Sequence, residues 1–154
     1  MEANKPIVVI TGVSGYVGSQ VCMSFLKHGG FKVRGTVRST KNPAKIEPLK
    51  KAFGEDLLKD LELVEADLMN EASIIDACEG CKYVVHTASP FPVKQPKNED
   101  ELIKPAVDGT LAAMKGALKH KCTRVVITSS IAAIYKSTDR KKKTHFTDED
   151  WTDV

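Results

Sequence analysis

Residues 6–18 read PIVVITGVSGYVG, and this stretch decides the fold. The run from Pro6 to Thr11 is short and rich in β-branched residues, with a proline at its start and a glycine after it, which is typical of a buried strand. From Tyr16 to His28 the apolar residues return at helical spacing, and the glycines at 29 and 30 end the pattern. The chain therefore opens with a strand, a glycine-rich turn and a helix.

The same alternation continues through most of the chain. Further strands are predicted at 31–37, 61–66, 83–86 and 124–128, and helices at 43–53 (ended by Gly54), 70–78 (with Asn70 as N-cap) and 98–120. Residues 89–96 hold three prolines and should form a loop, and no periodic element follows Tyr135. Strands that alternate with helices form a parallel sheet through right-handed crossovers. We therefore predict an α/β fold, a Rossmann-type doubly wound parallel sheet of about five strands in the order 3-2-1-4-5.

The composition is that of one globular domain over residues 1–154. Apolar residues make up 42% and charged residues 28%, which argues against disorder. The net charge of +3 is too even to favour nucleic acid, and we interpret the basic cluster at 140–143 as a solvated loop. The sequence shows neither a membrane-spanning run nor a secretory signal pattern. Four cysteines are too few for a disulfide scaffold, so we expect a cytoplasmic chain with reduced thiols.

The glycine-rich turn predicts a site for a dinucleotide. Gly12 allows the tight turn off the strand, Gly15 lets the backbone approach a pyrophosphate, and Gly18 lets the helix pack on the sheet. The start of the helix at Tyr16 and Val17 then offers free N–H groups and the positive end of its dipole. We also place Ser14 of the same turn among the cofactor-binding candidates. The alternative is a glycine-rich turn without a ligand.

Arg38, twenty residues beyond Gly18, decides which nucleotide is expected. An acidic residue at the end of the second strand would favour NAD, whereas a guanidinium there can bind a 2′-phosphate and stack on adenine. Lys45 lies within reach of the same loop, so we predict NADP(H), the alternative being a solvated surface arginine. Asp67 ends the third strand, where it could accept a hydrogen bond from the adenine amino group or serve as a turn residue.

The fourth strand runs into His86-Thr87-Ala88-Ser89-Pro90 and the fifth into Thr128-Ser129-Ser130. The carboxyl ends of both strands should face the crevice in which such sheets bind ligands. Small residues after the fourth strand would let a nicotinamide ribose lie against the backbone. A serine after the fifth could donate a hydrogen bond to a substrate carbonyl.

Several segments together resemble the extended short-chain dehydrogenase/reductase family, in its branch of dihydroflavonol, cinnamoyl-CoA and anthocyanidin reductases. The matching segments are TGVSGYVGS, GTVRS, EADL, VVHTASP, VVITSSIAAIY and the final DEDWTD. The resemblance implies NADPH-dependent reduction of a carbonyl, or the reverse oxidation. It implies a catalytic serine at Ser130, with Ser129 as the rival. It assigns to cofactor binding Gly12, Gly15, Tyr16, Val17, Arg38, Lys45, Asp67, Leu68, Thr87 and Ala88, to which we add Thr128, and to the substrate pocket Ser89, Pro90, Ile131 and Tyr135.

The family's Tyr-x-x-x-Lys is missing from this sequence. Tyr16, Tyr83 and Tyr135 are followed at the fourth position by glutamine, threonine and aspartate. The sequence therefore looks like the N-terminal half of a reductase, and without the general acid we expect little or no turnover from it alone. The helix at 98–120 could join a homodimer. The alternative is a non-catalytic nucleotide-binding or protein-interaction subunit.

Cys78-x-x-Cys81 could indicate zinc or redox chemistry. A second ligand pair is missing nearby, and the motif leaves a helix rather than beginning one, so we interpret both thiols as packing residues and expect no metal. His86 is expected in the core or behind the site.

Overall fold

The computed structural model describes residues 5–91, 96–135 and 144–152. Five parallel strands form one sheet in the order β3-β2-β1-β4-β5, which confirms the predicted topology. The strands are β1 (Ile7–Thr11), β2 (Lys32–Val37), β3 (Leu61–Glu65), β4 (Tyr83–His86) and β5 (Arg124–Ile127). The reversal of strand order between β1 and β4 opens the crevice in which open α/β sheets bind ligands.

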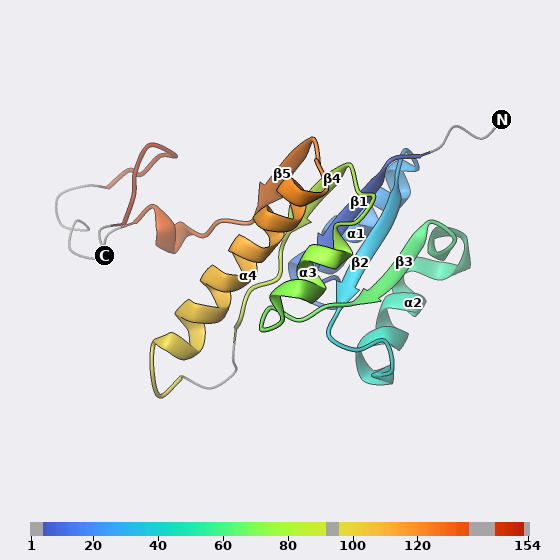
Figure 1. Ribbon diagram of the computed structural model, residues 1–154, viewed down its shortest axis with the longest axis horizontal. Coiled ribbons are helices and arrows are strands. Elements are labelled where there is room, and N and C mark those ends of the chain that lie inside the picture. Colours follow the sequence, from blue (N-terminus) through green and yellow to red (C-terminus); the bar gives the residue numbers. More distant parts are fainter. Residues whose placement is uncertain (1–4, 92–95, 136–143, 153–154) are drawn as a thin grey trace.

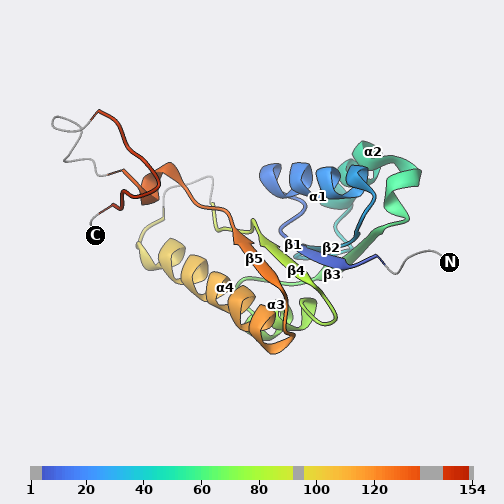
Figure 2. The same cartoon turned by 90° about the horizontal axis from the view of Figure 1, so that it is seen from above.

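Two helices cover each face of the sheet (Figure 1). Figure 2 shows α1 (Tyr16–His28) and α2 (Pro43–Leu58) on one face, with α3 (Glu71–Ala77) and α4 (Asp100–Lys119) on the other. The central strand serves both layers because successive side chains of a strand point to opposite faces. Val8 and Ile10 pack with Leu26 and Phe53 of α1 and α2, whereas Val9 packs with the residues of α3 and α4.

Helix α2 corrects one predicted boundary. The sequence predicted an end at Gly54, but the helical segment runs on to Leu58. Gly54 breaks the backbone there with φ 71° and ψ 164°, so a further turn follows in a new direction. That turn is kept because Leu57 and Leu58 pack against the core, a tertiary contact that local propensity does not encode.

The β5 side of the molecule is the least covered. Val126 is 51% exposed on this outermost strand, and a groove of about 140 Å³ lies beside it, between Phe25, Phe31, Tyr83 and Arg124. On the other face, α4 exposes an apolar row: Ile103, Val107, Leu111, Met114 and Leu118. Among the helices of the described residues, none is long and apolar enough to cross a membrane.

After β5, a short 3₁₀ turn, η1 (Ile131–Ala133), leads into the last described segment. Residues 144–152 contain neither helix nor strand. Thr152 fastens this segment, since its hydroxyl donates to the carbonyl of Tyr135 at 2.7 Å and its N–H to that of Ala133 at 2.9 Å. The basic cluster at 140–143 lies outside the described residues.

Candidate nucleotide-binding site

The glycine-rich turn lies at the carboxyl edge of the sheet, between β1 and α1. Gly12 takes the left-handed conformation with φ 71°, which makes the tight turn off the strand. A Cβ on Gly18 would collide with the carbonyl oxygen of Gly12 and would lie 2.8 Å from Oγ1 of Thr87. Only glycine therefore lets the first turn of α1 pack this closely on the ends of β1 and β4.

The first turn of α1 presents backbone donors to this edge. Gly15 is the N-cap, and within the described residues no side chain caps the helix there. The N–H groups of the first turn have no intrahelical acceptors, and the turn has no acidic residue to oppose an anion. Tyr16 is 89% exposed and Val17 is 46% exposed, so this turn lies at the protein surface. The loop thus fits a pyrophosphate in both shape and charge.

A hydrogen-bond network behind the turn joins β1 to β4. The hydroxyl oxygen of Thr11 accepts from the N–H groups of Thr87 and Ala88, each at 3.0 Å, and lies 2.9 Å from Nδ1 of His86. Because that oxygen already accepts two hydrogen bonds, its own proton must point to His86, and Nδ1 must be the acceptor. His86 is thereby fixed as the neutral tautomer protonated at Nε2, and burial lowers its pKa.

This network confirms that His86 is a core residue behind the site. Sequence reasoning missed Thr11, although its position as the last residue of a buried strand was the available signal. The hydroxyl of Thr87 also donates to the carbonyl of Thr11, so both residues after β4 are held against the glycine turn. Thr87 and Ala88 therefore form a fixed wall beside the expected path of a dinucleotide.

Arg38 lies next to the same turn. The N–H of Gly12 donates to Oγ1 of Thr36 at 3.0 Å, and that of Val13 to the Thr36 carbonyl at 3.1 Å. These bonds join the glycine turn to the end of β2, two residues before Arg38. Arg38 and Lys45 are both exposed, the former after β2 and the latter in the first turn of α2.

Asp67 serves as a turn residue, one of the two roles that the sequence left open, and its contact with adenine stays a prediction. Its Oδ1 accepts from the N–H of Met69 at 2.9 Å, which shapes the connection into α3. Ser73 closes the same connection, since the N–H of Asp67 donates to its hydroxyl at 3.0 Å. Leu68 is half-buried and packs against the α3–α4 core.

The residues after β4 and β5 form the other side of this edge. The N–H of Thr128 donates to the carbonyl of His86 at 3.0 Å, which extends the pairing beyond β5. Ser130 is exposed, and its hydroxyl accepts from the N–H of Ala132 at 3.2 Å, while its own proton has no acceptor among the residues that the structure describes. Ser89 and Ile131 are exposed, and Pro90 is half-buried. The ring of Tyr135 packs edge-on against Phe146, with 5.9 Å between ring centroids.

The cysteines of the Cys-x-x-Cys motif are core residues, as predicted. Both are buried, and burial raises the pKa of Cys78 to about 12 and that of Cys81 to about 11, so both thiols stay protonated at neutral pH. In the part of the chain that the structure describes, no three His, Cys, Asp or Glu residues gather as metal ligands. These thiols fill space between α3, α4 and the sheet.

The sequence matches the NAD dependent epimerase/dehydratase family over residues 8–152. Dihydroflavonol 4-reductase of Arabidopsis thaliana is 37% identical, over 100% of this chain and 39% of that protein. Cinnamoyl-CoA reductase CAD2 of Medicago truncatula is 38% identical, over 94% of this chain and 44% of that protein. Anthocyanidin reductase of Arabidopsis thaliana is 36% identical, over 94% of this chain and 42% of that protein. The predicted resemblance to this branch is therefore confirmed.

Solved structures agree in fold. Yeast methylglyoxal/isovaleraldehyde reductase Gre2 complexed with NADPH matches with a TM-score of 0.78 and 28% identity, over 96% of this chain and 44% of that one. Vestitone reductase from alfalfa matches with a TM-score of 0.74 and 31% identity, over 97% of this chain and 43% of that one. The chain thus spans less than half the length of the relatives described here. With its glycine turn, its sheet order and a match over nearly its whole length, this chain belongs to the NAD dependent epimerase/dehydratase family.

Proposed function

We propose that this chain is the NADP(H)-binding portion of an NADPH-dependent carbonyl reductase of the dihydroflavonol reductase type. The observation that carries the proposal is the position of the glycine turn and the uncapped start of α1. Hydrogen bonds to Thr36 hold this turn against the end of β2, and Arg38 follows directly after that strand. The two features match the two charged parts of NADP(H), its pyrophosphate and its 2′-phosphate.

Each group of residues has a separate task in this proposal. The first-turn N–H groups of α1 bind the pyrophosphate, while Arg38 and Lys45 bind the 2′-phosphate. Thr87 and Ala88, fixed by Thr11, support the nicotinamide ribose. When bound, the nicotinamide supplies the hydride that reduces a carbonyl carbon. The hydroxyl proton of Ser130 is available to orient the carbonyl oxygen of a small-molecule substrate.

The proton for that oxygen must come from elsewhere. None of the three tyrosines stands four residues before a lysine, so the sequence contains no tyrosine–lysine pair to serve as the general acid. We therefore propose that this chain binds NADP(H) and does not turn over a carbonyl by itself. The relatives are more than twice as long, and the substrate class rests on their longer chains.

The missing tyrosine–lysine pair also supports a second candidate function. A nucleotide-binding subunit without catalysis, or one that binds a partner protein, would also show this cofactor site without a general acid. The exposed apolar row on α4 supports a homodimer through this helix. We retain the cytoplasm as the proposed compartment, which the four free thiols favour.

Parallel titrations of NADPH and NADH by calorimetry test the proposal. We expect NADPH to bind at least about tenfold more tightly, because an arginine–phosphate pair is charge-assisted. Arg38→Ala should remove this preference, whereas Arg124→Ala removes the same charge at the amino end of β5 and serves as the control. Equal affinities for the two nucleotides in the unaltered protein would refute the assignment of NADP(H).

A further inference from the structure

Glu65 places a carboxylate beside the loop that is proposed to bind a phosphate. It is the last residue of β3, paired in register with Val37 of β2. Its Oε1 accepts two hydrogen bonds from Thr40, one from the backbone N–H and one from the hydroxyl, each at 2.8 Å. These bonds from Thr40, with smaller contributions from Lys41 and the Ser39 hydroxyl, lower the pKa of Glu65, so it is charged at neutral pH.

The loop needs such an anchor because little else holds it. Residues 38–41 lie between β2 and α2, and Arg38, Thr40 and Lys41 are exposed. Within the loop, the N–H of Lys41 donates to the Ser39 hydroxyl at 3.2 Å, a purely local bond. In the described part of the chain, the hydrogen bonds that leave this loop for another element end on Glu65.

A carboxylate at this place has an electrostatic cost for phosphate binding. A free negative charge would repel a 2′-phosphate held by Arg38. Here Oε1 accepts two hydrogen bonds from Thr40, and the positive charge of Lys41 attracts the carboxylate, so the loop itself partly offsets the charge. The same carboxylate also holds the loop that carries the positive charges, through its two bonds from Thr40.

We propose that Glu65 is a positioning residue for the 2′-phosphate: it fixes residues 38–41 across the end of β2 so that Arg38 and Lys41 face the ligand. This inference rests on the proposed NADP(H) function, and it adds Glu65, Thr40 and Lys41 to the residues that set the preference for NADP(H) over NAD(H). Arg38 has a long side chain that loses considerable entropy when it is ordered. A backbone already fixed by Thr40 reduces the ordering that binding requires.

The test uses two small probes that differ only in the phosphate in question, 2′,5′-ADP and 5′-AMP. Glu65→Ala should weaken 2′,5′-ADP by about tenfold, the size of one charge-assisted hydrogen bond, and leave 5′-AMP within about twofold. Glu65→Gln keeps an oxygen that accepts from Thr40, so it should restore most of the 2′,5′-ADP affinity. Calorimetry supplies both affinities, and thermal unfolding shows that each variant is folded.

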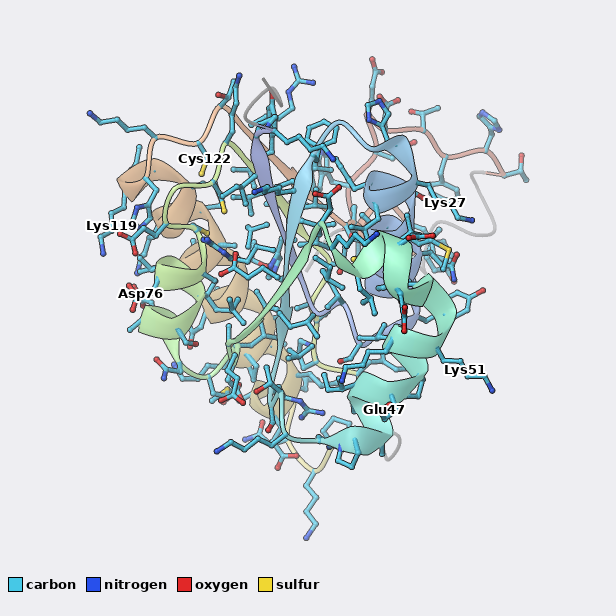
Figure 3. All side chains as sticks on the ribbon, turned by 90° about the vertical axis from the view of Figure 1, so that its right-hand side faces the viewer. Lys27, Glu47, Lys51, Asp76, Lys119 and Cys122 are labelled. Carbon is cyan, nitrogen blue, oxygen red and sulfur yellow. The ribbon has the colours of Figure 1, made fainter. Side chains whose placement is uncertain are left out.

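Asp76→Ala is the matched control. It removes one exposed carboxylate from the last turn of α3, which forms a 3.9 Å ion pair with Lys119. Figure 3 shows Asp76 on the opposite side of the molecule from α2, which carries Glu47 and Lys51. It should leave both affinities unchanged.

The possible outcomes distinguish a failure of the role of Glu65 from a failure of the proposed NADP(H) binding. If the unaltered protein binds both probes equally, the NADP(H) assignment fails. If the unaltered protein prefers 2′,5′-ADP, three results would overturn the role of Glu65 alone: an unchanged preference in Glu65→Ala, an equal loss for both probes, or tighter 2′,5′-ADP binding. Equal losses would mark a structural role, and tighter binding would show that repulsion dominates.

Discussion

Thr11 joins the end of β1 to the end of β4 through several hydrogen bonds of its side chain and its carbonyl. Its hydroxyl takes part in three interactions at 2.9–3.0 Å, one with His86 at the end of β4 and two with the residues that follow it, and Thr11 is 1% exposed. Thr11→Val keeps the shape and removes that hydroxyl. Two backbone N–H groups and the His86 ring then lose their partner at once.

The expected cost follows from these partners. Taking about 1 kcal/mol for each, the low end of the range for an unsatisfied buried group because Thr87 and Ala88 are half-buried, gives about 3 kcal/mol. Thr11→Ser keeps the hydroxyl and loses one buried methyl group, which costs about 1 kcal/mol. For a chain of this length, about 3 kcal/mol lowers the melting temperature by about 6–12 °C.

Urea and thermal unfolding followed by circular dichroism measure both variants. The prediction is a comparison, with the valine variant the less stable by about 2 kcal/mol although it is closer in shape to threonine. If Thr11→Val is as stable as Thr11→Ser, the network does not hold the two strands together. The deduced tautomer of His86 would then also lose its basis.

Four further predictions concern His86, Gly18, Arg34 and Leu111. Because the folded-state pKa of His86 is lowered, the unfolded chain takes up a proton first, so stability should fall as the pH drops below about 6.5. Unfolding at pH 5 and pH 8 tests this, and His86→Asn should lose that part of the pH dependence. Gly18→Ala should weaken NADPH binding by more than about tenfold, because its Cβ collides with Gly12 and displaces the loop, while Ser19→Ala should bind normally in the same titration. Arg34→Lys should be about 2 kcal/mol less stable to urea, since Arg34 bonds Glu62 and the carbonyl of Ala77 at 2.8 and 3.0 Å, and an ammonium cannot reproduce this fork; no loss would refute it. Leu111→Glu on the exposed face of α4 should convert a dimer to a monomer in sedimentation, and a protein already monomeric at high concentration would exclude this interface.

The sequence predicted the order of the strands because that information is local and repeated. The β-branched run Ile7–Thr11 and the helical spacing in Tyr16–His28 are each read within a few residues, and the rules for crossovers then restrict the topology. It also located the glycine turn, because its spacing is itself the signal.

The pairings between distant side chains could not be predicted in this way. Thr40 and Glu65 are 25 residues apart, and Thr11 and His86 are 75 apart. Whether such pairs meet depends on strand register and on the shape of the connecting loop, which single-sequence patterns do not fix. The extra turn after Gly54 was missed for a related reason, since its leucines gain their place only from the folded core.

The distribution of burial separates nucleotide binding from reaction chemistry. The strands that would hold the adenine half, β1 and β2, lie in a closed core where Val8, Val9 and Val33 are at most 1% exposed. Strand β5, which leads to Ser130, is the more exposed one. A groove lies beside one of its faces, and helix α4 on the other face exposes an apolar row to solvent. Cover over β5 would therefore change the position of Ser130 more than that of Arg38. Under the proposed function, nucleotide affinity should thus depend on the contacts of β1 and β2, whereas carbonyl reduction also needs a proton donor that the tyrosines of this sequence do not supply.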